Sequence, residues 1–318
     1  MTADVDLAPL DVPSPIRVYV ATTEAQMLAV RVLEYSIRKH ASMTVEVYPM
    51  HLGGVEIPQP RDRKNWPRTP FSFQRFIIPE MAGYKGRAIY LDSDMQVFKD
   101  IKDLWSLPFN DAQVLTVREP LESGRRPQFS VMLLDCDRLD WKIQDVVNKL
   151  DAGELSYEHL MYDLAIAKAI GADIDSSWNC LERHEEGRTA LLHYTDMSTQ
   201  PWVSTDNPLG YLWFRDLFEA IDCGFISEEY VRGHVDRGFV RPSLWFQVTH
   251  RIEDPFLLPR EAKLSDKDYK AAFMSVHTHG ASAWLTTEAF IKAIFRQAPR
   301  KTGITALRRR VNAYFDRD

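Results

Sequence analysis

The chain has 318 residues, of which 45% are hydrophobic and 26% are charged, a composition typical of a globular protein with one large domain or one domain and an appendage. Its formal net charge of -6 gives no general electrostatic reason to expect nucleic acid binding. Its three cysteines are widely spaced and include no Cys-x-x-Cys pair, which argues against a disulfide framework and a cysteine-rich zinc site.

The first residues carry no pattern of a regular element. Residues 1–14 are acidic and contain prolines, and they lack the basic and then apolar plan of a secretion signal. No apolar stretch of the sequence is long enough to cross a bilayer. We therefore expect residues 1–15 to form a flexible N-terminus and the protein to lie in the reducing cytoplasm.

A strand, a helix and a second strand are predicted next. Residues 16–21 alternate and are rich in β-branched side chains, as in a strand. Thr23 and Gln26 have the spacing of a capping box, and apolar residues then recur at helical spacing up to three basic residues at 38–40. A second strand is predicted at 45–48. This order is typical of a βαβ unit, so we expect parallel strands in a mixed α/β sheet.

The remaining elements divide the chain into a part with strands and a part that is mainly helical. Further strands are predicted at 87–91, 114–117, 131–134 and 190–194, and helices at 143–150 and 162–170. Beyond about residue 208 the pattern is mainly helical, with helices predicted at 214–221, 227–237 and 287–296. We therefore expect a sheet-based domain over residues 16–210 and a mainly helical C-terminal extension over residues 211–318.

Two acidic residues, Asp92 and Asp94, follow the strand predicted at 87–91. Carboxylates at the tip of a buried strand are costly unless a cation neutralises them. A divalent metal ion can do so, since hard cations take oxygen ligands from carboxylates and complete their coordination with phosphate oxygens. The alternative is a polar turn with solvated carboxylates, because Asp-x-Asp is a short pattern.

The whole run from Arg87 to Trp105 resembles the metal-binding segment of glycosyltransferase family 8. The shared features are the strand, the Asp-x-Asp at 92–94 and the trailing Asp-Ile-x-x-Leu-Trp at 100–105. Members of this family are retaining, nucleotide-sugar-dependent enzymes of GT-A fold. The resemblance covers about residues 16–203, and it implies a Rossmann-like mixed sheet flanked by helices, a nucleotide-sugar donor and a saccharide or other hydroxyl acceptor.

The resemblance also implies a third metal ligand, His193. In the family a histidine at the equivalent position, before a Lys-Pro-Trp, is the remaining protein ligand to manganese. The implied ligands are therefore Asp92, Asp94 and His193, a set that suits Mn²⁺ better than Mg²⁺ because of the nitrogen. This chain has Gln200 where the family has the lysine, and the spacing to Trp202 is one residue longer. A histidine after an apolar strand can also be a hydrogen-bonded core residue, and that interpretation stays open.

Turns at the carboxyl ends of strands are where open α/β sheets bind ligands. From the resemblance, we expect the donor to contact Ala21, Thr22, Thr23, Arg75, Asp92, Ser93 and Gln200. The family often has an aspartate and a tyrosine where this chain has Thr23 and Gln26. A capped helix without a role in nucleotide binding is therefore the alternative for the first turn.

Three side chains are candidates for a direct part in the transfer. Arg75 lies in a segment similar to the family's helix before the Asp-x-Asp strand, and its planar guanidinium suits a diphosphate; an ion pair within the protein is the alternative. Gln128 stands where the family has an asparagine-small-glycine turn, close to the donor sugar. Glu158 replaces a glutamine that approaches the reacting face of that sugar, where a carboxylate can steady an oxocarbenium-like centre. The alternative for Glu158 is an exposed acid that starts a helix.

The sequence thus predicts a metal-dependent glycosyltransferase that moves a hexose from a nucleotide diphosphate sugar, a UDP-sugar by resemblance, to an acceptor hydroxyl with retention. A non-catalytic relative that binds nucleotide sugars stays open, because the chain departs from the family at Gln128, Glu158 and Gln200. A sugar-nucleotide pyrophosphorylase is less favoured, since no glycine-rich loop follows the first strand. The basic end around Arg308–Arg310 fits either peripheral contact with the anionic inner face of a membrane or a solvated terminal helix.

Overall fold

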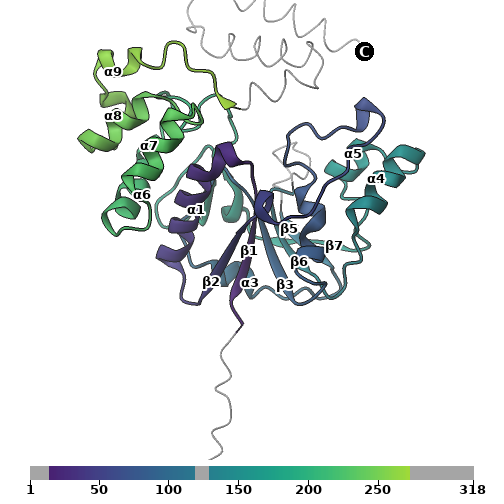
Figure 1. The fold of residues 1–318 in the computed structure, drawn as a ribbon. Coiled ribbons are helices and arrows are strands. Elements are labelled where there is room, and N and C mark those ends of the chain that lie inside the picture. The colour runs from purple at the N-terminus through teal and green to yellow at the C-terminus, as the bar shows by residue number, and fades with distance from the viewer. Residues whose placement is uncertain (1–13, 119–128, 273–318) are drawn as a thin grey trace, which may run out of the picture.

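A six-stranded sheet forms the centre of the protein in the computed structural model, which describes residues 14–118 and 129–272 (Figure 1). In chain order the strands are β1 (Ile16–Ala21), β2 (Val45–Pro49), β3 (Arg87–Asp92), β5 (Val114–Val117), β6 (Val131–Asp135) and β7 (Ile170–Ile174). Across the sheet they lie in the order β2-β1-β3-β6-β5-β7. Only β6 is antiparallel to its neighbours β3 and β5, so the sheet is mixed. The predicted fold class, a mixed α/β sheet flanked by helices, is confirmed.

Helices cover both faces of this sheet. On one face, α1 (Met27–His40) and α3 (Ile101–Trp105) pack in a buried cluster with Val18 and Val20 of β1. On the other face, α2 (Ile78–Met81), α4 (Ile143–Ala152) and α5 (Tyr157–Tyr162) pack with Tyr19 and Ala21 of the same strand. Successive side chains of a strand point to opposite faces, so the central strands read as apolar runs because both of their faces are covered.

A second sheet of three strands joins the first at the turn after β3. Its strands are β4 (Met95–Val97), β8 (Cys180–Leu181) and β9 (Leu191–His193), in the order β4-β9-β8. Met95 lies opposite His193 in the antiparallel pair of β4 and β9, and the backbone N–H of Tyr194 donates to the carbonyl oxygen of Asp94 at 2.8 Å. This pairing places the residues at the end of β9 beside the turn that ends β3.

Helices follow the second sheet, namely α6 (Gly210–Asp222), α7 (Glu228–Asp236), α8 (Ser243–His250) and α9 (Arg260–Leu264). Of these helices α6 lies beside α1 in Figure 1, and Leu28 and Val32 of α1 share a buried cluster with Trp213 and Leu217 of α6. The helices predicted at 214–221 and 227–237 are thus present, with slightly different ends. Within the described residues, no helix combines the length and apolar character needed to span a membrane. The helix predicted at 287–296 and the basic end at Arg308–Arg310 lie outside the described residues.

The helix predicted at 162–170 is wrong. α5 ends at Tyr162, and Leu164 has a φ angle of 48°, in the left-handed region that a helix does not tolerate. Leu164 is nevertheless buried, and the indole N–H of Trp141 donates to the carbonyl oxygen of Ile166 at 3.2 Å. Residues 170–174 then form β7 at the edge of the sheet. The apolar side chains of this segment therefore pack in the core from an irregular loop, which sequence periodicity cannot distinguish from a helix.

Candidate functional site

Asp92, Asp94 and His193 come together where the two sheets meet. One ligand atom of each of these side chains lies within 4.8 Å of the other two. The side chains of Asp92 and Asp94 are 15% and 16% exposed, and His193 is buried. The strand order therefore brings together the three residues that the family resemblance implies as metal ligands.

The imidazole of His193 is held by Asn179, a residue of the short helical turn Ser176–Asn179. The Nδ1 atom of His193 lies 2.9 Å from Oδ1 of Asn179. Because an amide oxygen only accepts, Nδ1 carries the hydrogen and Nε2 presents a lone pair in the neutral ring. Nε2 lies 3.1 Å from Oδ1 of Asp94, a buried oxygen with no hydrogen-bond donor among the described residues. Two facing acceptor atoms require a cation between them, which is either a proton or a metal ion.

The electrostatics of His193 agree with this geometry. Burial acts to lower the pKa of the imidazole, but the carboxylate of Asp94 acts to raise it, and the pKa is raised overall. The surroundings of Nε2 therefore favour positive charge at this point. Two carboxylates and one imidazole form a donor set that fits Mn²⁺.

Gln200 fixes the other oxygen of Asp94. Its Nε2 group donates to Oδ2 of Asp94 at 2.9 Å and to the carbonyl oxygen of Tyr194 at 3.0 Å. Both amide hydrogens are therefore used within the protein. Gln200 is buried, and its neutral amide orients the carboxylate of Asp94. Its contact with the donor stays a prediction.

Arg75 and Tyr90 surround Asp92. The hydroxyl of Tyr90 donates to Oδ1 of Asp92 at 2.5 Å, and Nη2 of Arg75 lies 3.8 Å from the same oxygen. Nη1 of Arg75 also donates to the carbonyl oxygen of Phe129 at 3.0 Å. The ion pair that the sequence left as the alternative for Arg75 is thus present. It places a buried positive charge next to the carboxylates, and the contact of Arg75 with a diphosphate stays a prediction.

The end of β1 lies directly beside Asp92. Ala21 is the register partner of Asp92, and the side-chain amide of Gln74 bonds both the N–H and the carbonyl oxygen of Thr22, each at 2.8 Å. The predicted capping box is present, since the N–H of Thr23 donates to Oε1 of Gln26 at 3.2 Å. Ala21, Thr22 and Ser93 are buried, whereas Thr23 is partly exposed.

A pocket of 320 Å³ lies between Thr23 and Gln200. Gln26 and Gln200 supply polar groups to its wall, and Phe71 and Trp202 supply apolar surface. Ligand pockets of this kind combine apolar walls with a few polar groups. Because Gln200 also bonds Asp94, this pocket lies next to that carboxylate.

Of the two other candidate catalytic residues, Glu158 and Gln128, the structure describes only Glu158. Glu158 lies in the first turn of α5, its side chain is 55% exposed, and its Oε1 atom lies 3.2 Å from Nη2 of Arg68. This matches an exposed acid at a helix start, and a role at the donor sugar stays a prediction. Gln128 lies outside the described residues.

Three residues that hydrogen-bond the candidate site residues were assigned no role from the sequence, namely Asn179, Tyr90 and Gln74. Tyr90 could have been found, because residues two apart on a strand share a face and Tyr90 precedes Asp92 by two. Asn179 stands in a Trp-Asn turn, at 178–179, that resembles a turn of the family, but the sequence does not show that it bonds His193. Gln74 carries no such signal, since it bonds Thr22 of another element.

Comparison with known proteins agrees with the resemblance. Residues 14–152 match the sequence model of Glycosyl transferase family 8. Protein CDI of Arabidopsis thaliana is 27% identical over 232 residues, which cover 64% of this chain and 87% of that protein.

Two solved structures are similar at lower identity. The apo form of the glycosyltransferase GlyE of Streptococcus pneumoniae TIGR4 has a TM-score of 0.46 at 19% identity over 64% of this chain, and the match spans only 60% of the length of GlyE. The galactosyltransferase LgtC, in complex with donor and acceptor sugar analogues, has a TM-score of 0.49 at 13% identity, over 69% of this chain and 100% of LgtC. Residues 14–152 are therefore similar in sequence to glycosyl transferase family 8, and this similarity supports a glycosyltransferase.

Proposed function

We propose that this protein transfers a hexose from a nucleotide diphosphate sugar to an acceptor hydroxyl with retention at the anomeric carbon. The proposed donor is a UDP-sugar, and the proposed cofactor is Mn²⁺ or Mg²⁺ at Asp92, Asp94 and His193. The observation that carries the proposal is the approach of Nε2 of His193 to Oδ1 of Asp94 at 3.1 Å, with Nδ1 committed to Asn179. This arrangement prepares one nitrogen and one oxygen for the same cation.

The protein side chains position and neutralise the diphosphate in this proposal. A bound divalent cation supplies Lewis-acid stabilisation of the charge on the leaving diphosphate. Arg75 adds a fixed positive charge 3.8 Å from Asp92, in a buried setting where such a charge needs little reorganisation. Gln200 holds Asp94, and Ala21, Thr22, Thr23 and Ser93 form the turns against which the nucleotide lies.

Glu158 and Gln128 complete the proposed site on the side of the donor sugar. Glu158 would face the anomeric centre as positive charge develops there, and Gln128 would hold a sugar hydroxyl. Nη2 of Arg68 lies 3.2 Å from Oε1 of Glu158 and orients this carboxylate.

A nucleotide-sugar-binding protein without transfer activity is the second candidate. It is favoured by Gln200, which donates both amide hydrogens to Asp94 and Tyr194 and offers a diphosphate no positive charge. A pyrophosphorylase is disfavoured, since the turn from Ala21 to Glu24 contains no glycine for a phosphate-binding loop.

Release of nucleotide from a panel of UDP-, GDP- and other nucleotide sugars separates these functions. With Mn²⁺ we expect release by the wild type and by Asp103→Asn, a matched control on the exposed side of α3, but not by Asp94→Asn. Thermal stabilisation by a nucleotide sugar without any release by the wild type would favour the binding protein. Release that continues after removal of divalent metal would contradict the proposed cofactor.

We further propose a cytoplasmic location with peripheral contact between Arg308–Arg310 and an anionic membrane face. The three cysteines are unpaired, as is usual in a reducing compartment. Cosedimentation with vesicles of anionic lipid, and not with neutral vesicles, is the expected result. Equal cosedimentation after replacement of the three arginines by glutamine would contradict this contact.

A further inference from the structure

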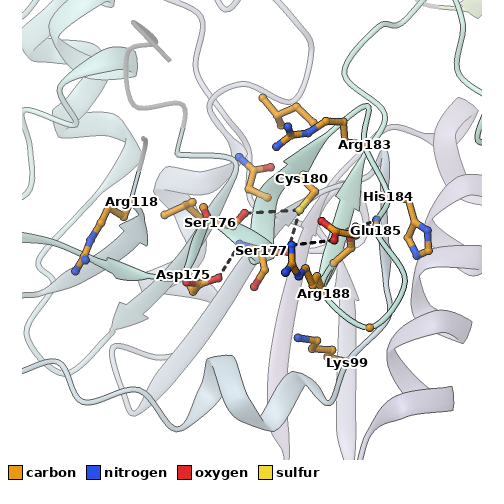
Figure 2. A pocket seen from close by; sticks show the side chains of 15 residues that line it. Lys99, Arg118, Asp175, Ser176, Ser177, Cys180, Arg183, His184, Glu185 and Arg188 are labelled. Atoms are coloured by element: carbon orange, nitrogen blue, oxygen red, sulfur yellow. Dashed lines mark hydrogen bonds and ion pairs between the residues drawn. The ribbon is translucent and has the colours of Figure 1, made fainter. Parts of the chain in front are cut away.

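The proposed metal ligands are held by residues of turns, and these turns are themselves fixed by other side chains. Asn179, the partner of His193, ends the helical turn Ser176–Asn179 at the wall of a pocket of 810 Å³. Figure 2 shows how this turn is fixed: the side chain of Asp175 accepts from the backbone N–H of Ser177 at 2.9 Å and so caps it.

The turn that carries Gln200, at residues 200–203, lines the smaller pocket of 320 Å³ through Gln200, Trp202 and Val203. Within this turn the carbonyl oxygen of Gln200 accepts from the backbone N–H of Val203 at 2.8 Å. The carbonyl oxygens of Pro201 and Trp202 come next along the chain, and in a buried place such groups need a donor.

Arg241 supplies that donor to both carbonyl oxygens. Its backbone N–H donates to the carbonyl oxygen of Trp202 at 2.9 Å, and its Nε group donates to that of Pro201 at 3.1 Å. Two donors from one residue fix the orientation of two neighbouring peptide groups. Arg241 directly precedes α8, so these bonds tie the 200–203 turn to the C-terminal helices.

The side chain of Arg241 is fully buried, which makes it costly. Within the described residues its guanidinium donates to the carbonyl oxygen of Pro201, Oγ of Ser243 and Oε1 of Gln247, all of them neutral. Burial lowers the pKa of Arg241 to about 10, although the carboxylate of Asp266 acts to raise it, so the group stays charged at neutral pH. Neutral acceptors offset only part of the cost of removing a charge from water. An apolar side chain would avoid this cost but could not hold Pro201.

The position of the 200–203 turn decides where the amide of Gln200 points. This amide donates one hydrogen to Oδ2 of Asp94 and the other to the carbonyl oxygen of Tyr194. Hydrogen bonds weaken as their distance and angle depart from the preferred values, so a shift of the turn would loosen both bonds. Asp94 would then lose the contact that orients its other oxygen toward Nε2 of His193.

We propose that Arg241 is a positioning residue of the proposed metal site, which holds the 200–203 turn so that Gln200 orients Asp94 toward the cation. The proposal rests on the proposed metal site at Asp92, Asp94 and His193. It gives the C-terminal helices a part in metal binding, although Arg241 lies beyond residues 14–152, which match the family model.

A double-mutant cycle in Mn²⁺ affinity tests this role. The full chain is titrated with Mn²⁺ as wild type, Arg241→Lys, Gln200→Ala and the double variant, and electron paramagnetic resonance measures the free ion. Lysine keeps the charge but loses the planar fork. Each single variant is expected to bind Mn²⁺ about tenfold more weakly, as is typical when a residue that orients a metal ligand is lost.

The double variant carries the decision. Because Arg241 acts through Gln200, the double variant is expected to bind Mn²⁺ no more weakly than Gln200→Ala alone. Independent effects would multiply to a loss of about a hundredfold.

Val248→Ala is the control for a general loss of stability. Val248 is a buried residue of α8, and its truncation destabilises the same helix without removing a hydrogen bond to the 200–203 turn. It is expected to lower the midpoint of urea unfolding and to leave the Mn²⁺ affinity unchanged. A loss of affinity in Val248→Ala as large as in Arg241→Lys would overturn the positioning role.

The remaining outcomes separate this role from the metal site itself. Mn²⁺ binding by the wild type with equal affinity in Arg241→Lys, or with multiplied losses in the double variant, would overturn the role of Arg241 alone. Absence of Mn²⁺ binding by the wild type would overturn the metal site and this role with it. If circular dichroism shows that Arg241→Lys is unfolded, Gln247→Ala takes its place in the cycle, because it removes one acceptor of the guanidinium, and the same outcomes decide.

Discussion

The Nδ1 atom of His193 lies 2.9 Å from Oδ1 of Asn179, and this bond decides which imidazole nitrogen is available to a cation. With Nδ1 committed, Nε2 faces Asp94. Asn179 therefore acts on the proposed metal site through His193, as a positioning residue.

Replacement of Asn179 by alanine should weaken metal binding. Loss of a hydrogen bond that orients a metal-bound histidine typically lowers metal affinity roughly 10–100-fold, and we expect Asn179→Ala to do so. Calorimetric titration with Mn²⁺ measures the change, with Asn148→Ala on the exposed face of α4 as the control. Equal Mn²⁺ affinity in wild type and Asn179→Ala would remove the role assigned to this residue.

Gln200→Ala should destabilise the fold. The change leaves Oδ2 of Asp94 and the carbonyl oxygen of Tyr194 without their donor in a buried place. Such a loss costs about 1–3 kcal/mol in the free energy of unfolding. Urea unfolding should show a lower midpoint with an unchanged m value, whereas Gln144→Ala on the surface of α4 should leave the midpoint unchanged. A stability equal to the wild type would mean that water replaces the amide.

Arg75→Lys should reduce turnover more than it reduces folding stability. A lysine keeps the charge but loses the fork that reaches both Asp92 and the carbonyl oxygen of Phe129. Removing one preorganised donor at a developing charge costs roughly 10²–10³ in kcat, and a loss of this order is expected. Steady-state kinetics with the donor found in the nucleotide-release panel provides the measurement. An unchanged kcat would restrict Arg75 to the internal ion pair.

The three thiols should differ in reactivity. Burial raises the pKa of the Cys136 thiol to about 12, so this residue is protonated and inaccessible at pH 8. Cys223 is exposed and Cys180 is intermediate, so native protein should react first at Cys223, then at Cys180, and at Cys136 only after unfolding. Site-resolved alkylation rates check this order. Rapid reaction of Cys136 in the native protein would contradict the burial of β6 and its following turn.

The central strands could be predicted from the sequence because both of their faces are buried, which makes them continuous apolar runs. β7 could not, since it is a half-exposed edge strand, and the apolar residues before it pack from an irregular loop. The spacing of apolar residues predicts a helix here, but Leu164 and its neighbours are apolar because they pack in the core from an irregular loop.

The candidate site was predictable to a different extent for each residue. Asp92 and Asp94 follow from charge at the end of a buried strand, whereas the place of His193 required the resemblance to a family. The bond from Gln200 to Asp94 joins residues 106 positions apart, and no spacing in the sequence encodes it. The two interpretations of Arg75, an internal ion pair and a contact with the diphosphate, are compatible. Its guanidinium pairs with Asp92 and would also lie next to the proposed diphosphate.

Mn²⁺ binding by the wild type and by His193→Gln, followed by electron paramagnetic resonance, tests the proposed metal site most directly. Circular dichroism establishes that the variant is folded. Coordination by Asp92, Asp94 and His193 predicts one bound ion per chain in the wild type and a loss of affinity of at least about tenfold in the variant. Equal affinity and stoichiometry in the folded variant would contradict a metal ion held by His193.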